Sequence, residues 1–130
     1  MLPPETKLSV DLEEPWPEQD LLVLRAVGEI DIATVDQFRE ILRRLADLRR
    51  ANVVIDASGV TFMDSTGLHA LIEGKRAIHN VNAHIVLVCS PQVRRILELM
   101  FPERLFADRV DTLQEALAVI NRRDEESIGA

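Results

Sequence analysis

An acid, two hydroxyls and a glycine stand side by side near the middle of the chain, as Asp64, Ser65, Thr66 and Gly67 in the stretch VTFMDSTGL. An apolar run precedes them and an amphipathic segment follows, so they fall where one element ends and a helix begins. Free N–H groups at a helix start attract negative charge, which makes a phosphate on either hydroxyl chemically reasonable. A glycine lets another protein approach closely. These residues predict a modification or binding site; the ordinary alternative is a helix cap formed by Asp64 or Ser65.

The strands that position this stretch are read from apolar patterning. Alternation of apolar and polar residues before and after the proline-containing break at residues 15–20 predicts a hairpin, and short continuous apolar runs predict strands buried on both faces. We expect five strands, near residues 7–14, 21–28, 52–56, 84–89 and 105–110.

Four amphipathic helices alternate with these strands. Thr34 with Gln37 has the spacing of a capping box, as Thr112 has with Glu115. Ser90-Pro91 is a cap followed by proline in the first turn. The expected inward stripes are Val35, Phe38, Ile41, Leu42, Leu45 and Leu48; Leu68, Leu71, Ile72 and Ala77 or Ile78; Val93, Ile96, Leu97 and Met100; and Leu113, Ala116, Leu117 and Ile120.

A strand pair followed by strand and helix repeats predicts one α/β domain over residues 1–130. We expect a mixed, mostly parallel sheet of about five strands with about four helices, and functional loops at the strand ends. The core covers about residues 7–120, and residues 121–130 form a polar tail that we expect to fray. Asp64, Ser65 and Thr66 then occupy the loop and first turn after the strand that ends near Asp56.

Composition narrows the possible partners. The 130 residues are 47% hydrophobic and 28% charged, as in an ordinary globular domain, and the formal net charge is −7. This charge argues against nucleic acid or an anionic membrane as a partner and favours a basic protein surface. No window approaches the roughly 18 apolar residues of a membrane helix, and the N-terminus has no leader, so we expect no membrane insertion and a cytoplasmic location.

Thiol and imidazole groups give no sign of a metal or cofactor site. Cys89 is the single cysteine and lies in an apolar run, which predicts a buried thiol and excludes a disulfide within the chain. His69, His79 and His84 lack the helical spacing of metal ligands and have no nearby thiolate pair. We therefore predict neither metal nor cofactor.

Two segments resemble the STAS domain family of bacterial anti-sigma factor antagonists, and the order of elements agrees. They are Gly28-Glu29-Ile30-Asp31, and Val54-Ile55-Asp56 with Gly59-Val60-Thr61-Phe62-Met63-Asp64-Ser65-Thr66-Gly67-Leu68. In that family the first hydroxyl after the acid of the Asp-Ser-Ser/Thr-Gly motif is phosphorylated. The resemblance therefore implies Ser65 as the regulatory site, a choice that the residues alone leave open between Ser65 and Thr66.

The resemblance also implies the partners. The unphosphorylated protein would bind an anti-sigma factor that is also a serine kinase and so free a sigma factor. Phosphorylation would end this binding, and a serine phosphatase would restore it. The implied partner-binding residues are Asp31, Asp64, Ser65, Thr66, Gly67 and His69. The chain itself would be no enzyme. From its position alone, Asp31 could equally cap the helix near residue 34.

Three other function classes are compared with this one. A serine hydrolase would need Gly-x-Ser-x-Gly, but Met63 stands two residues before Ser65 and no triad histidine is identifiable. An aspartyl-phosphate receiver could use Asp56, yet an acidic metal-binding pair after the first strand is not convincingly placed. The serious rival is a scaffold of the same fold, or a subunit of a transport or stress-sensing assembly, that is not switched by phosphorylation.

Overall fold

The computed structural model describes residues 6–16, 18–100 and 108–129, with side chains up to residue 123. Within these residues, strands and helices follow in the predicted order. Their bounds are β1 Leu8–Glu13, β2 Leu21–Ile30, α1 Val35–Leu48, β3 Asn52–Met63, α2 Ser65–His79, β4 His84–Cys89, α3 Pro91–Met100, β5 Arg109–Val110 and α4 Leu113–Gly129. The expected last strand is present at its end, and residues 105–107 of that prediction lie outside the described residues.

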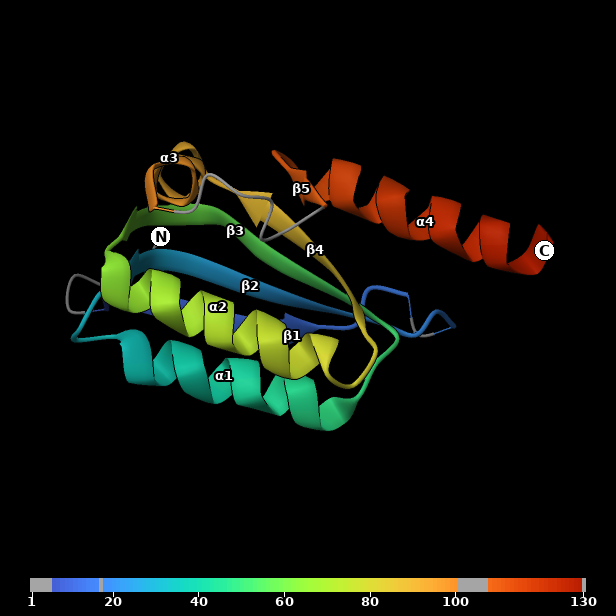
Figure 1. Ribbon diagram of the computed structural model, residues 1–130, viewed down its shortest axis with the longest axis horizontal. Coiled ribbons are helices and arrows are strands. Elements are labelled where there is room, and N and C mark those ends of the chain that lie inside the picture. Colours follow the sequence, from blue (N-terminus) through green and yellow to red (C-terminus); the bar gives the residue numbers. More distant parts are fainter. Residues whose placement is uncertain (1–5, 17, 101–107, 130) are drawn as a thin grey trace.

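The strands form one sheet in the order β1-β2-β3-β4-β5. β1 pairs antiparallel with β2, which confirms the hairpin, and all other neighbours pair in parallel. Helices α1 and α2 lie side by side on one face of the sheet, and α4 lies on the other (Figure 1). Helix α3 packs beside the end of β3. The predicted mixed, mostly parallel α/β domain is confirmed.

Two apolar clusters hold these layers together because side chains alternate between the faces of a strand. The larger cluster joins one face of the sheet to α1, α2 and α3, and the smaller one joins the opposite face to α4. β3 shows the alternation: Val53 and Ile55 belong to the larger cluster, whereas Val54 belongs to the smaller. Trp16, from the loop between β1 and β2, packs against the smaller cluster.

β3 is longer than predicted. We expected it to end near Asp56, but it continues to Met63. β4 ends opposite Ala57, so among the described strands residues 58–63 pair with β2 alone. The prediction was short because a small residue, a serine and a glycine interrupt the apolar run after Asp56, although the backbone stays extended through them. The extension brings the strand directly to the residue before α2.

The predicted capping box at the start of α1 is not formed. The Thr34 hydroxyl donates to the Glu29 carbonyl oxygen at 2.8 Å, and Gln37 Nε2 donates to the Leu8 carbonyl oxygen at 3.3 Å. These two side chains tie the helix start to β2 and β1. Bonds from these two side chains to the neighbouring strands therefore replace the predicted local pair.

The caps of the last two helices agree with the sequence. Ser90 Oγ accepts from the Val93 N–H at 3.1 Å, and Pro91 begins α3. Thr112 Oγ1 accepts from the Glu115 N–H at 3.1 Å. Both helix starts are fixed by a side chain that satisfies an otherwise unbonded N–H.

Helix ends differ from the predicted stripes. Leu48 and Met100, the last members of their stripes, are 49% and 50% exposed. Ile78 is buried and Ala77 is exposed, which decides between those two. We expected the tail from residue 121 to fray, but α4 continues as far as Gly129. No helix among the described residues has both the length and the apolar character needed to cross a bilayer.

Candidate functional site

The junction between β3 and α2 carries the predicted motif. Met63 ends the strand, Asp64 keeps an extended backbone, and Ser65 begins the helix. Asp64 Oδ1 accepts from the Gly67 N–H at 3.0 Å, so Asp64 is the helix cap. Of the two residues predicted as possible helix caps, Asp64 caps α2 and Ser65 does not.

The two hydroxyl residues differ in exposure. Ser65 is exposed, whereas Thr66 is half-buried. Within the described part of the chain, no group accepts a hydrogen bond from the backbone N–H of either residue. Two free N–H groups at the positive end of a helix dipole form a suitable environment for an anion.

Gly67 is needed for close packing of α2. A Cβ atom at this position would lie 2.7 Å from Ile30 Cγ2, 2.9 Å from the Ile30 carbonyl oxygen and 3.0 Å from Met63 Cγ. The first turn of the helix therefore rests directly on the ends of β2 and β3. Any side chain would lift it away.

Two further hydrogen bonds fix the junction from opposite sides. The Asp64 N–H donates to the Ile30 carbonyl oxygen of β2 at 3.3 Å, and the Met63 N–H donates to Gln92 Oε1 of α3 at 2.9 Å. Sequence reasoning missed Gln92. It has no local signal, because its partner is far away in the sequence and only the fold brings them together.

The structure shows one of the two roles considered for Asp31. Its Oδ1 accepts from the backbone N–H of Ala33 at 2.9 Å and of Thr34 at 3.2 Å. The carboxylate therefore closes the turn before α1, as a capping residue does. Its backbone follows Ile30, whose carbonyl oxygen holds Asp64, so the two loops are neighbours.

His69 is exposed and lies one turn after Ser65. Residues four apart share a face of a helix, so these two side chains point to the same side of α2. Of the predicted residues, Asp64, Ser65, Thr66 and His69 thus lie together at the accessible start of α2, whereas Gly67 is buried against Ile30 and Met63. Asp31 lies beside it on the neighbouring loop.

Two exposed apolar residues were not predicted. Ile32 follows β2 and is 80% exposed, and Phe62 near the end of β3 is 42% exposed. Ile30 and Met63 pair where β2 and β3 end. Ile32 and Phe62 therefore lie at the same end of the sheet as the start of α2. An apolar residue inside the polar loop Asp31-Ile32-Ala33-Thr34 is the signal that could have identified Ile32.

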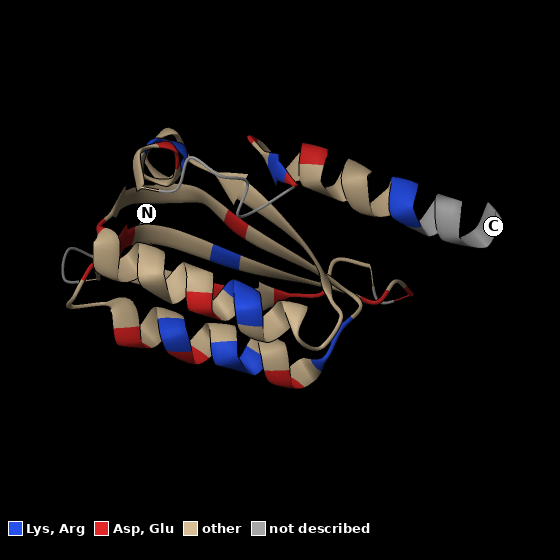
Figure 2. Cartoon of the chain, in the orientation of Figure 1, with Lys and Arg blue, Asp and Glu red and all other residues tan. Residues whose placement is uncertain are grey.

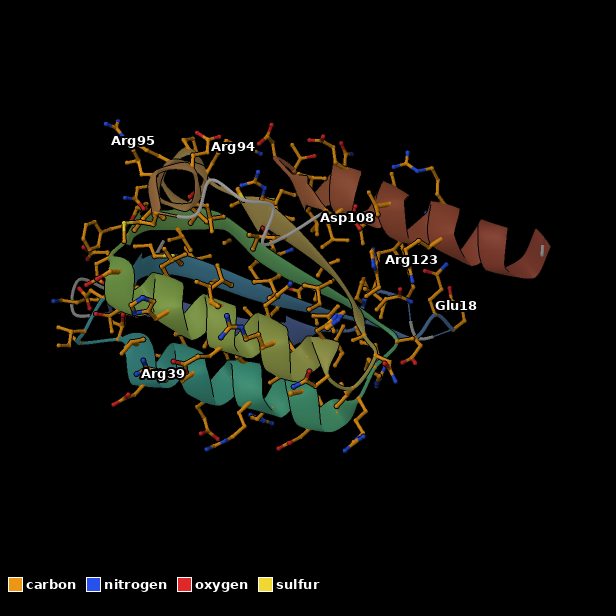
Figure 3. The ribbon with its side chains drawn as sticks, in the orientation of Figure 1. Glu18, Arg39, Arg94, Arg95, Asp108 and Arg123 are labelled. Atoms are coloured by element: carbon orange, nitrogen blue, oxygen red, sulfur yellow. The ribbon has the colours of Figure 1, made fainter. Side chains whose placement is uncertain are left out.

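Helix α3, which packs beside the end of β3, carries the charged residues Arg94, Arg95 and Glu98. Arg94 pairs with Asp111, while Arg95 is exposed. Figure 3 shows the two on opposite sides of α3, with Arg94 on the side nearer β5. Along the outer side of α1, acidic and basic residues are mixed (Figure 2). Neither helix presents charge of a single sign.

Asp56, the candidate aspartyl-phosphate acceptor, has a structural role. Its side chain is 5% exposed. Oδ1 accepts from the Ser58 hydroxyl at 2.6 Å, and Oδ2 lies 3.5 Å from Arg25 Nε. A carboxylate held in this way is closed to an incoming phosphoryl group. Among the described residues, no three His, Cys, Asp or Glu side chains are grouped as metal ligands would be.

Comparison with known proteins gives a consistent result. A family model of the STAS domain matches residues 17–118. The chain is 34% identical over 86 residues to a STAS-domain containing protein of Pseudomonas aeruginosa (strain UCBPP-PA14), a match that covers 65% of this chain and 84% of that protein.

Solved structures share the fold. An anti-sigma factor antagonist from Mycobacterium paratuberculosis has a TM-score of 0.76 at 23% identity, covering 93% of this chain and 99% of that one. The Bacillus cell fate determinant SpoIIAA in its phosphorylated form has a TM-score of 0.66 at 23% identity, covering 86% and 99%. With the family match over most of its length, this chain belongs to the STAS domain family.

Proposed function

We propose that this protein is an anti-sigma factor antagonist switched by phosphorylation of Ser65. The unphosphorylated form binds an anti-sigma factor that is also a serine kinase, and a sigma factor is released. The observation that carries this proposal is the exposed Ser65 hydroxyl at the start of α2, next to an acid that already caps the helix. The protein is the substrate of the cycle and does no catalysis itself.

Known structures of this fold support the proposal. One is an anti-sigma factor antagonist, and another, SpoIIAA, exists in a phosphorylated form. Exposure favours Ser65 over Thr66 as the acceptor, because a kinase must reach the hydroxyl and Thr66 is half-buried. The N–H groups of both residues remain free to bond the phosphate.

The switch works by charge at an interface. Phosphoserine adds about −1.5 to −2 charge at pH 7. At a helix start this charge is tolerated, and even stabilises by roughly 0.3 to 1 kcal/mol. Inside a packed interface an unpaired charge costs several kcal/mol, and about 1.4 kcal/mol changes affinity tenfold. Binding is therefore lost while the fold is kept.

The partner surface consists of the start of α2 and its neighbours. Ser65 and His69 share one face of the helix, and Asp31 and the exposed Ile32 and Phe62 adjoin it. Apolar residues at the centre of a contact supply most of its affinity, since they lose water on binding. A serine phosphatase acting on the same exposed position completes a cytoplasmic cycle.

The test is an affinity capture from lysate of the native host with wild type, Ser65→Ala and Ser65→Asp as baits. Mass spectrometry should identify a serine kinase of the anti-sigma type with wild type and Ser65→Ala, and at least tenfold less with Ser65→Asp. If all three baits retain the same transport or scaffold proteins, the protein is a scaffold of this fold and Ser65 is not its switch.

A further inference from the structure

The free edge of β3 after Ala57 is the starting observation. β4 ends there, and in the described part of the chain no strand pairs with residues 58–63 on that side. Helix α3 packs against this part of β3. The N–H groups on an unpaired strand edge need acceptors when they are buried, and here a side chain of α3 supplies one.

Gln92 is that side chain. Its Oε1 accepts from the Met63 N–H at 2.9 Å, and Met63 is only 1% exposed. Gln92 is itself held in place, because it follows Pro91 in the first turn of α3 and Ser90 caps that turn through the Val93 N–H. The acceptor is therefore presented from a rigid helix start.

We propose that Gln92 is a positioning residue for Ser65; this inference rests on the proposed function. Met63 lies two residues before Ser65. Its N–H points to α3, and the next N–H, of Asp64, points to the Ile30 carbonyl oxygen of β2. The peptide planes before Ser65 are thus held from both sides, and this fixes the direction in which the chain enters α2.

Loss of the Gln92 acceptor removes one of these two supports. The Met63 N–H then has no partner, and the peptide plane between Phe62 and Met63 is free to turn toward another acceptor. With the Ile30 support alone, the chain enters α2 less rigidly, and the Ser65 hydroxyl is held less firmly relative to the surface on which a kinase docks. Phosphoryl transfer depends on close alignment of the attacking oxygen, so the transfer step is affected more than docking.

The test uses the full chain as substrate, Mg-ATP, and clarified lysate of the native host as the source of kinase. Intact and peptide mass spectrometry quantify phosphoserine at position 65 against substrate concentration. Gln92→Met keeps the length of the side chain without the acceptor, Gln92→Asn withdraws the amide, and Gln92→Glu keeps an acceptor. Gln37→Met is the matched control, because Gln37 also bonds strand backbone from a helix but does not touch Met63.

We expect the maximal rate to fall at least tenfold in Gln92→Met and Gln92→Asn with KM within twofold of wild type. Gln92→Glu should stay within threefold of the wild-type rate, and Gln37→Met should not change it. A kinase-free readout accompanies this: hydrogen exchange of the Met63 amide, followed by NMR, should become at least tenfold faster only where the acceptor is lost.

The outcomes separate the two proposals. If wild-type Ser65 is not phosphorylated at all, the proposed function fails and the role of Gln92 falls with it. If wild type is phosphorylated and Gln92→Met matches its maximal rate, Gln92 has no positioning role, although the switch stands. Should Gln92→Met not fold by circular dichroism, Gln92→Asn decides by the same criterion.

Discussion

At Gly67 the first turn of α2 touches the strands that support it. The nearest atoms to an added Cβ include the Ile30 carbonyl oxygen at 2.9 Å, which belongs to the sheet backbone and cannot move aside. Gly74 on the same helix differs, because the three atoms nearest to an added Cβ all belong to the Leu42 side chain, the nearest at 2.7 Å. A leucine side chain can adjust where a strand cannot.

Gly67→Ala should therefore lower the free energy of unfolding by about 1–3 kcal/mol, the usual cost of overpacking. Gly74→Ala should lose less, since repacking of Leu42 and the better helix propensity of alanine, about 1 kcal/mol, offset the contact. Urea denaturation of both variants measures the difference. Equal losses would show that α2 does not depend on close approach at Gly67.

Ile32 is the most exposed of the large apolar residues described, at 80%. Ile32→Ser should weaken capture of the anti-sigma partner about tenfold, because burying such a side chain contributes about 1.5–3 kcal/mol. The free energy of unfolding of the Ile32→Ser variant should hardly differ from that of wild type. Leu48→Ser is the control, an exposed apolar position at the end of α1. An equal effect of both substitutions would remove Ile32 from the interface.

At the scale of elements, β4 and α4 meet near a half-buried histidine. His84 Nε2 lies 2.8 Å from Asp108 Oδ2, without hydrogen-bond geometry. Burial lowers the pKa of His84, Arg123 of α4 lowers it further, and Asp108 raises it in part. Figure 3 shows Asp108 and Arg123 on the α4 side of the sheet. The folded state therefore favours neutral His84.

This pKa direction predicts a loss of stability in acid. As the pH falls through about 6.5, the ordinary pKa of histidine, the unfolded chain takes up its proton before the folded chain does. The contribution of His84 is fully present above that pH and is lost as the pH falls toward the folded pKa, by at most about 1.4 kcal/mol per pH unit. Urea unfolding at pH 7.5 and 5.5 measures it.

His84→Gln should show a shallower fall in the free energy of unfolding between these two pH values than wild type. His79→Gln, at an exposed position of α2, should keep the wild-type slope. If His84→Gln keeps it as well, the histidine does not couple α4 to pH.

Local patterns predicted the elements that depend on local physics. β4 was predicted at its observed bounds, because an apolar run between a turn and a serine–proline pair has few other structures open to it. The end of β3 could not be read in this way. Its last residues stay extended because β2 and α3 hold them, and residues 57–59 alone suggest a turn.

In the candidate site, too, some features follow from the local sequence and others from the packing of the whole molecule. The motif itself placed Ser65 at a helix start, and Asp64 caps as its type predicts. The support from Gln92, the exposure of Phe62 and the bond from Gln37 to the Leu8 carbonyl oxygen arise only when distant segments pack. No single sequence window contains them.

For the molecule as a whole, a switch must change binding and leave the fold intact. The chain has a formal charge of −7 before modification, but at the junction the phosphate would meet two free N–H groups. Genetically encoded phosphoserine at position 65 should therefore leave the thermal midpoint within a few degrees of wild type. A large loss of stability would mean that release follows from unfolding.

The most direct test of the switch is the affinity of the captured anti-sigma partner for the wild-type protein with and without phosphoserine at position 65, measured by calorimetry at matched salt. The phosphorylated form should bind at least tenfold more weakly while its circular dichroism spectrum stays unchanged. Equal affinity of the two forms would contradict a switch at Ser65.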